Sequence, residues 1–154
     1  MLTANGKAIC KLNGSKDRCE GINYMELLNT SNASVNVGAL TAFSKLMSSF
    51  RIMVGTGSTA PTSHDYNLTN EDAGLTVINK TNTHSAGDYH QDYIAVYTGT
   101  YRNDTENDIT VSEVGIMGQD VDGAGQPWFL IARDTFESVT IAPGETYTFS
   151  MYIG

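Results

Sequence analysis

The sequence has little of what brings covalent, metal or strongly electrostatic chemistry to a protein. It contains two cysteines, three prolines and one tryptophan, and charged residues make up only 17% of its 154 positions. With 9 basic against 17 acidic residues the net charge is −8, which argues against a broad basic surface for nucleic acid or anionic lipid. No apolar run approaches the roughly 20 residues that a membrane-spanning helix needs. We therefore expect no nucleic-acid partner and no membrane insertion.

The two cysteines, Cys10 and Cys19, flank a polar run of four residues at 13–16. If that run is a hairpin loop, the two cysteines face each other and can form a disulfide. Two free thiols are the alternative, which a reducing cytosol favours. A closed zinc site is excluded because no pair of histidines lies near them. The surrounding residues also lack the apolar stretch and cleavage site of a secretory signal.

Threonine, serine, asparagine and glycine are abundant, which is typical of strands and turns. Apolar and polar residues alternate with a period of two in several segments, and turn signals separate them. Such segments are 50–54, 75–79, 93–101 and 146–153, of which the last is the clearest, and a turn at 142–145 leads into it. Residues 128–132 are a continuous apolar run of strand length. Residues 108–117 change parity, so this segment must bury both faces or contain a bulge at 112–113. The pattern predicts an all-β protein, an antiparallel β-sandwich of Ig-like or jelly-roll-like type.

The chain divides by composition into a basic N-terminal arm or small hairpin, residues 1–34, and a β-sandwich domain, residues 35–154. We expect at most one or two short helices. Ile22–Leu28 has weak helical spacing, with an extended arm as the alternative. Residues 35–49 are open between a strand and a helix, and a helix over Gly38–Ser48 is slightly favoured.

Short matches to chemical motifs fail in their context. Residues 55–60, GTGSTA, fit the dinucleotide-binding pattern G-x-G-x-x-A, but Pro61 and the turn-forming residues after it exclude the helix that such a site needs. Residues 120–123, DVDG, resemble the start of a calcium loop without its later ligands and read better as a hairpin loop. No nucleophile–base signature is present. We therefore expect no cofactor, no metal and no enzymatic activity.

Three segments carry a resemblance. Residues 52–62, IMVGTGSTAPT, with Asp65 and Leu68, resemble a stretch that recurs in bacteriophage virion proteins. Residues 109–117, ITVSEVGIM, and 130–136, LIARDTF, are similar to two later segments of those proteins, in the same order. The resemblance covers about residues 50–154 and is typical of tail fibre, baseplate and head appendage modules. The matching positions are Gly55, Gly57, Pro61, Glu113, Gly115 and Arg133.

This resemblance implies a structural protein of the virion, assembled in the bacterial host cytoplasm. The tail, a tail fibre or a related appendage is the first expectation, with a capsid decoration or head-fibre protein as an alternative. Its partners would be other virion proteins and copies of itself in a symmetric homo-oligomer, and host attachment would be a further role.

Two expectations concern side chains in the strands. Glu113 and Arg133 are charged residues in apolar strands, so they are predicted either to form a buried or interfacial salt bridge or to face solvent. Tyr97 and Tyr101 are candidate contacts for a host glycan in a carbohydrate-binding module, and core packing is the alternative.

Overall fold

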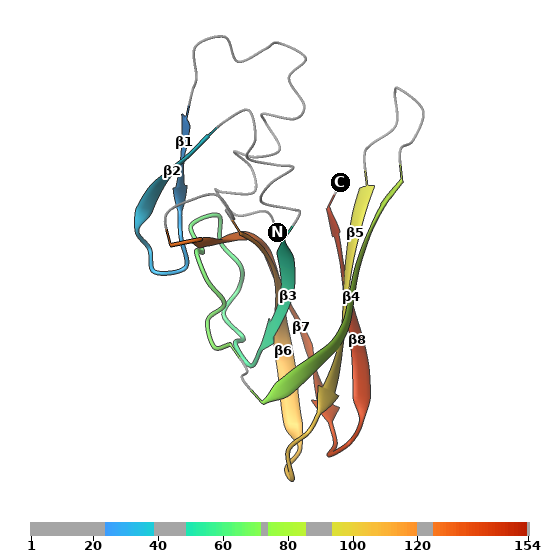
Figure 1. Ribbon diagram of the computed structural model, residues 1–154. Coiled ribbons are helices and arrows are strands. Elements are labelled where there is room, and N and C mark those ends of the chain that lie inside the picture. Colours follow the sequence, from blue (N-terminus) through green and yellow to red (C-terminus); the bar gives the residue numbers. More distant parts are fainter. Residues whose placement is uncertain (1–23, 39–48, 72–73, 86–93, 120–124, 154) are drawn as a thin grey trace. The chain divides into compact units, whose positions relative to one another are not determined.

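A computed structural model describes residues 24–38, 49–71, 74–85, 94–119 and 125–153, all of them in strands, turns and loops (Figure 1). The strands are β1 (Tyr24–Leu28), β2 (Ser34–Gly38), β3 (Phe50–Gly55), β4 (Leu75–Ser85), β5 (Ile94–Asn103), β6 (Ile109–Gln119), β7 (Trp128–Ile141) and β8 (Thr146–Ile153). They form a two-stranded sheet, β1-β2, and two three-stranded sheets in the orders β3-β6-β7 and β4-β5-β8. The protein is an all-β antiparallel β-sandwich.

The chain forms two compact units that are discontinuous in sequence. Unit 1 takes the described residues of 1–50, 61–67 and 116–133, and unit 2 takes those of 51–60, 68–115 and 134–154. The boundary predicted between residues 34 and 35 falls inside the β1-β2 hairpin, so the structure divides the chain elsewhere. The arm up to residue 23 and the helix expected after Gly38 lie outside the described residues.

Residues 24–28 form a strand, which corrects the helical reading of Ile22–Leu28. The five residues of β1 pair in antiparallel register with β2, from Tyr24 opposite Gly38 to Leu28 opposite Ser34. The connecting turn is shaped by Asn29, whose side-chain Oδ1 accepts hydrogen bonds from the backbone N–H groups of Ser31 and Ala33. Such Asx turns fix the chain reversal locally, and cross-strand pairing then outweighs a weak helical spacing.

The two three-stranded sheets face each other within unit 2. The Tyr101 hydroxyl of β5 donates a hydrogen bond to the Ile52 carbonyl of β3. The ring of Phe149 on β8 lies 6.0 Å from that of Tyr101 and 5.8 Å from that of Phe136 on β7 in the opposite sheet. Gly99 is buried at a point where an added Cβ would lie 3.1 Å from the Ile52 Cβ, so a side chain there would push the sheets apart.

The alternation read from the sequence is confirmed in the edge and final strands. In β3, Phe50, Ile52 and Val54 are buried while Arg51 is exposed. In β8, Phe149 and Met151 point inward, as the period of two requires. In β6 every residue from Glu113 to Gly118 is buried. Both faces of this strand are therefore covered, which is the first of the two explanations predicted for its change of parity.

Asn103 at the end of β5 joins the loop between β5 and β6 to the end of β7, both in unit 2. Its side-chain amide donates to the carbonyls of Asn107 and Ile141, both at 2.8 Å, and its Oδ1 accepts from the backbone N–H and hydroxyl of Thr105. The neighbouring turn at 142–145 closes with Gly144 at φ 77°, which makes it a type II turn with Pro143 in its preferred place.

Replacing Asn103 with alanine is expected to lower the free energy of unfolding by about 2–3 kcal/mol, since the carbonyl of Ile141, the partly buried carbonyl of Asn107 and the N–H of Thr105 lose their partner. Urea unfolding followed by circular dichroism measures this. Thr110→Ala, at an exposed position of β6, the next strand along the chain, is the control and is expected to change stability by less than about 0.5 kcal/mol. Equal effects of the two substitutions would contradict the role of the Asn103 side chain in joining these segments.

Candidate functional site

Gly55 and Gly57, the two glycines of the first resembling segment, pack directly against the buried carboxyl group of Glu113. A Cβ added to Gly57 would lie 2.5 Å from Oε1 and 2.7 Å from Cδ of Glu113. A Cβ on Gly55 would lie 2.6 Å from the same oxygen and would overlap the backbone carbonyl of Asn70. These distances are shorter than the contacts that real Cβ atoms make, so only glycine fits at positions 55 and 57.

Glu113 uses its carboxyl group to hold the backbone of the loop that follows β3. The side chain is fully buried, and its oxygens accept hydrogen bonds from the backbone N–H groups of Gly57 at 3.1 Å, Thr69 at 3.1 Å and Asn70 at 2.8 Å. These three amides belong to the two ends of one loop, 56–70. A single side chain from β6 therefore ties both ends of the loop to the sheet, and backbone N–H groups that would otherwise need water are satisfied.

Arg133 has an equivalent role within unit 1. The residue is 1% exposed, and its guanidinium Nη1 donates a hydrogen bond to Oδ2 of Asp65 at 2.8 Å. Asp65 also accepts hydrogen bonds from the backbone N–H and hydroxyl of Thr62. Partial burial acts to raise the pKa of Asp65, but the hydrogen bonds from Thr62 and the pairing with Arg133 outweigh it, so the pKa is lowered. The middle of the same loop is thus held by a partly buried ion pair, in which Arg133 is buried and Asp65 is partly exposed.

Asp65→Asn is expected to lower stability by about 1–3 kcal/mol at pH 7, since a buried guanidinium loses its charged partner. Because the pKa of Asp65 is lower in the folded than in the unfolded chain, its contribution is complete well above the ordinary value of 3.8. It disappears as the pH falls through the folded value. Urea unfolding at a series of pH values should therefore show the two proteins converging as the pH is lowered towards 3. A difference that stays constant across this range would contradict the ion pair.

The remaining residues of the resemblance, Pro61 and Gly115, lie close in sequence to these contacts. Pro61 is half-buried at the start of the segment 61–67, and Gly115 is buried in β6 two residues after Glu113. Glu113 and Arg133 are both buried, so neither is an exposed strand charge, and each has partners within its own unit. A salt bridge between them would join the two units and stays a prediction. Cys10 and Cys19 lie outside the described residues, as do residues 120–124.

The candidate glycan contacts are corrected by the structure. Tyr97 and Tyr101 are 1% and 4% exposed and belong to the core between the sheets. Burial, and secondarily the charge of Glu71, raises the pKa of the Tyr101 phenol, which is in keeping with its hydroxyl acting as a donor to Ile52. Neither ring offers a face for a sugar. Alternation predicted that the two tyrosines share a face but did not say that this face is the buried one.

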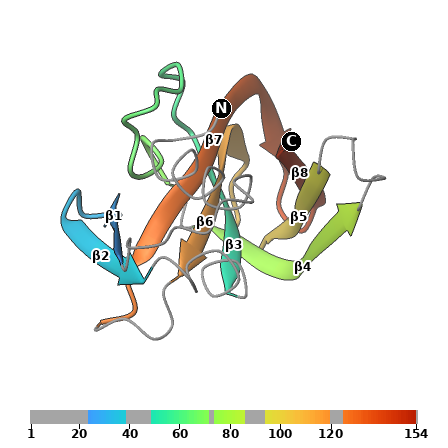
Figure 2. The same cartoon turned by 90° about the horizontal axis from the view of Figure 1, so that it is seen from above.

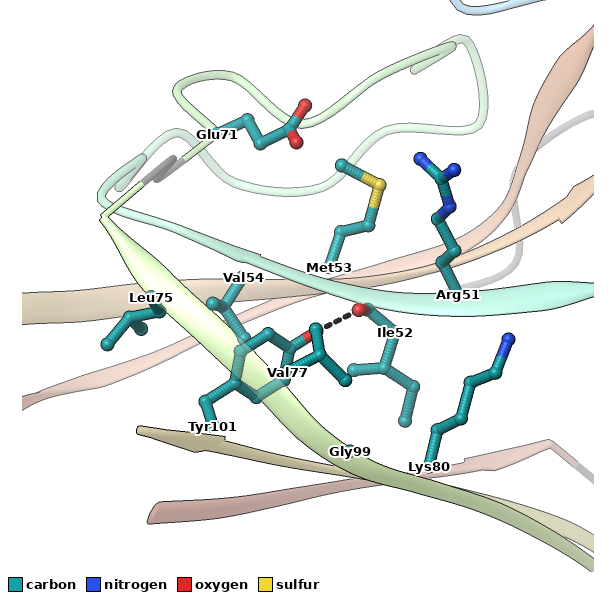
Figure 3. A pocket seen from close by; sticks show the side chains of 10 residues that line it. All are labelled: Arg51, Ile52, Met53, Val54, Glu71, Leu75, Val77, Lys80, Gly99 and Tyr101. Atoms are coloured by element: carbon teal, nitrogen blue, oxygen red, sulfur yellow. Dashed lines mark hydrogen bonds between the residues drawn. The ribbon is translucent and has the colours of Figure 1, made fainter. Parts of the chain in front are cut away.

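The structure adds a cavity that sequence reasoning missed. It has a volume of about 360 Å³ and opens between β3 and β4 within unit 2 (Figure 3). Its apolar wall is formed by Ile52, Val54, Leu75 and Val77, and Tyr101 closes its inner end. The charged side chains of Arg51, Lys80 and Glu71 also line it. A cavity of this volume, with an apolar wall and a few charged groups, is typical of sites that accept one side chain or a small molecule.

A β-bulge places Lys80 in this cavity. Val77 pairs with Tyr101, and Lys80 pairs with Gly99, with a register shift between Val77 and Asn79. Tyr101 and Gly99 are two residues apart and share the inner face of β5. Without the bulge, Val77 and Lys80 would lie three residues apart on opposite faces of β4. The extra residue therefore brings the lysine to the inner face, and no simple alternation in the sequence could have indicated it.

Among the described residues, no group of three or more histidine, cysteine, aspartate or glutamate side chains could hold a metal ion. The same part of the chain has no helix long and apolar enough to cross a lipid bilayer. No protein family, no curated protein and no solved structure matches this chain.

Proposed function

We propose that this protein is a structural component of a bacteriophage virion, in the tail, a tail fibre or a related appendage, and that it acts through protein–protein assembly. The observation that carries the proposal is the place of the charged residues in the three resembling segments. Glu113 of the second segment binds backbone of the first, and Arg133 of the third binds Asp65 of the first. Each segment of the resemblance thus contributes to holding one loop.

These contacts support a structural rather than a chemical role for the resembling residues. Glu113 and Arg133 are 0% and 1% exposed, and the two glycines pack against Glu113, so a substrate has no access to these groups. A catalytic group must be accessible to its substrate, whereas a group that fixes the backbone is most effective when it is buried. Backbone that is fixed by buried side chains in this way is suited to a fixed contact with a neighbouring protein.

Immunogold labelling of purified particles of the source phage tests the proposal. An antibody against unit 2 is expected to label the tail or its fibres, at symmetric positions. Label spread over the head would favour the alternative of a capsid decoration or head-fibre protein. Particles that lack the chain in both labelling and mass spectrometry, while the infected cell contains it, would overturn the proposal.

A further inference from the structure

The cavity between β3 and β4 is a feature of unit 2 that a purely structural role does not require. All the residues that line it belong to unit 2, and β3 and β4 lie next to each other in both views of the fold (Figure 1, Figure 2). Its volume of about 360 Å³ is in the range of cavities that hold a small molecule. The cavity therefore has the size of a ligand site, and its lining indicates the chemistry of the ligand.

The two ends of this cavity differ in charge. At one end, a Cβ added to Gly99 would lie 3.1 Å from the Ile52 Cβ, and Lys80 pairs with Gly99 in the register. Arg51 directly precedes Ile52 in β3, so both basic residues belong to this end. At the other end, Glu71 forms an antiparallel bridge with the last residue of β3. Figure 3 shows the same order, with Arg51 and Lys80 toward one end and Glu71 toward the other.

The wall between these ends is mainly aliphatic. Ile52 and Val54 line it from β3, and Leu75 and Val77 line it from β4. The Tyr101 hydroxyl donates its hydrogen to the Ile52 carbonyl, so the tyrosine presents mainly its ring to the cavity. Each methylene group of a ligand that leaves water for such a wall contributes favourably to binding. The wall therefore suits an alkyl chain.

We propose that this cavity binds a small molecule with an alkyl chain and one carboxylate group. The chain lies along the aliphatic wall, and the carboxylate lies at Arg51 and Lys80. An arginine has five N–H donors and a lysine has three, so each can bind a carboxylate in addition to the interaction that it already makes. The lining has two basic groups and one acidic group, although the whole chain has a net charge of −8.

Glu71 gives the site a direction. Its carboxylate repels a second anionic group, so the carboxylate of the ligand is favoured at the basic end and a dicarboxylate is disfavoured. The site thus selects one charged group at one end of an apolar chain. This ligand site goes beyond the proposed virion role and does not depend on it.

Titration of the full chain, followed by heteronuclear NMR, tests the site with ligands of equal chain length. Octanoate, below the concentration at which it forms micelles, is expected to shift the amide resonances of cavity residues such as Val54 and Val77 until they saturate. Its affinity should exceed that of 1-octanol at least about threefold, the scale of a solvent-exposed charge pair. Octylammonium and octanedioate should both bind more weakly than octanoate, because the first lacks an anionic group and the second carries two.

Two pairs of variants locate the chain and the carboxylate. Val77→Phe should weaken octanoate binding at least about tenfold, because its ring occupies space that the alkyl chain needs. Thr81→Phe adds the same ring at an exposed position of β4 outside the cavity and should bind as the wild type does. Lys80→Met removes a charge from the basic end and should lower the affinity for octanoate but not for 1-octanol. Arg102→Met removes the same charge outside the cavity and should change neither.

The comparison of ligands uses the wild-type chain, so it decides the question even if a variant fails to fold. Shifts that do not saturate with any of the ligands would overturn the inference. Equal affinity for octanoate and octylammonium, or saturable shifts confined to residues away from the cavity, would overturn it as well. Immunogold label on the particle would still support the proposed function in each of these cases.

Discussion

Replacing Glu113 with alanine is expected to lower the free energy of unfolding by about 3 kcal/mol or more, the largest stability effect of any polar substitution in the described residues. Three backbone N–H groups, of Gly57, Thr69 and Asn70, lose their acceptor, and each unsatisfied buried donor costs about 1–3 kcal/mol. The loss is less than the full sum if water enters the space of the missing side chain.

Urea unfolding followed by circular dichroism measures this effect, with the fluorescence of the single tryptophan, Trp128 in unit 1, as a second probe. Coinciding transitions from both probes are needed for a two-state analysis. Glu113→Gln is the matched control, because it keeps one acceptor oxygen and the side-chain volume, and it should lie between wild type and alanine. A loss of less than about 0.5 kcal/mol for the alanine variant, the size of a neutral surface change, would contradict the anchoring role.

Gly57→Ala is expected to cost about 2–3 kcal/mol in the wild type but less than about 1 kcal/mol when Glu113 is already alanine. The reason is that the added Cβ would overlap the Glu113 carboxyl group, 2.5 Å from Oε1, and the second substitution removes that group. The two changes should therefore be strongly non-additive in a double-mutant cycle.

Gly55→Ala provides the comparison for this cycle. Its Cβ overlaps the backbone carbonyl of Asn70 as well as the Glu113 oxygen, and a backbone atom cannot move aside as a side chain can. Its cost should therefore persist in the Glu113→Ala background. Additive effects for Gly57 and Glu113, or equal relief at both glycines, would show that the loop is not packed on the carboxyl group as described.

The strands were predictable because their signal is local. Phe50, Ile52 and Val54 are buried on one face of β3 while Arg51 between them is exposed, and Pro143 and Gly144 mark the turn before β8. The strand at 24–28 was read as weakly helical because three apolar residues had helical spacing, while its true determinant is pairing with β2. Pairing depends on residues that lie elsewhere in the chain, so spacing alone could not reveal it.

The partners of the buried charges could not be read from the sequence. Glu113 and Arg133 were recognised as unusual in apolar strands, but the carboxyl group binds backbone amides 43 to 56 residues away, and those amides carry no sequence signature. The glycines at 55 and 57 were the available signal, since a G-x-G after a strand indicates that another group approaches closely. The identity of that group required the fold.

The β-bulge in β4 shows the same limit for the cavity. Val77 and Lys80 would be assigned to opposite faces by a period of two, and only the register shift brings both to the inner face. Likewise, the two core tyrosines of β5 were grouped correctly on one face, and burial of that face depends on the opposing sheet.

The most direct test of the central claim, that this chain is a structural part of a virion, is a cryo-electron microscopy map of the phage particle. The account predicts repeated density in the tail or an attached appendage into which the β-sandwich of unit 2 fits. A complete map of the particle in which no density fits this fold would contradict the claim.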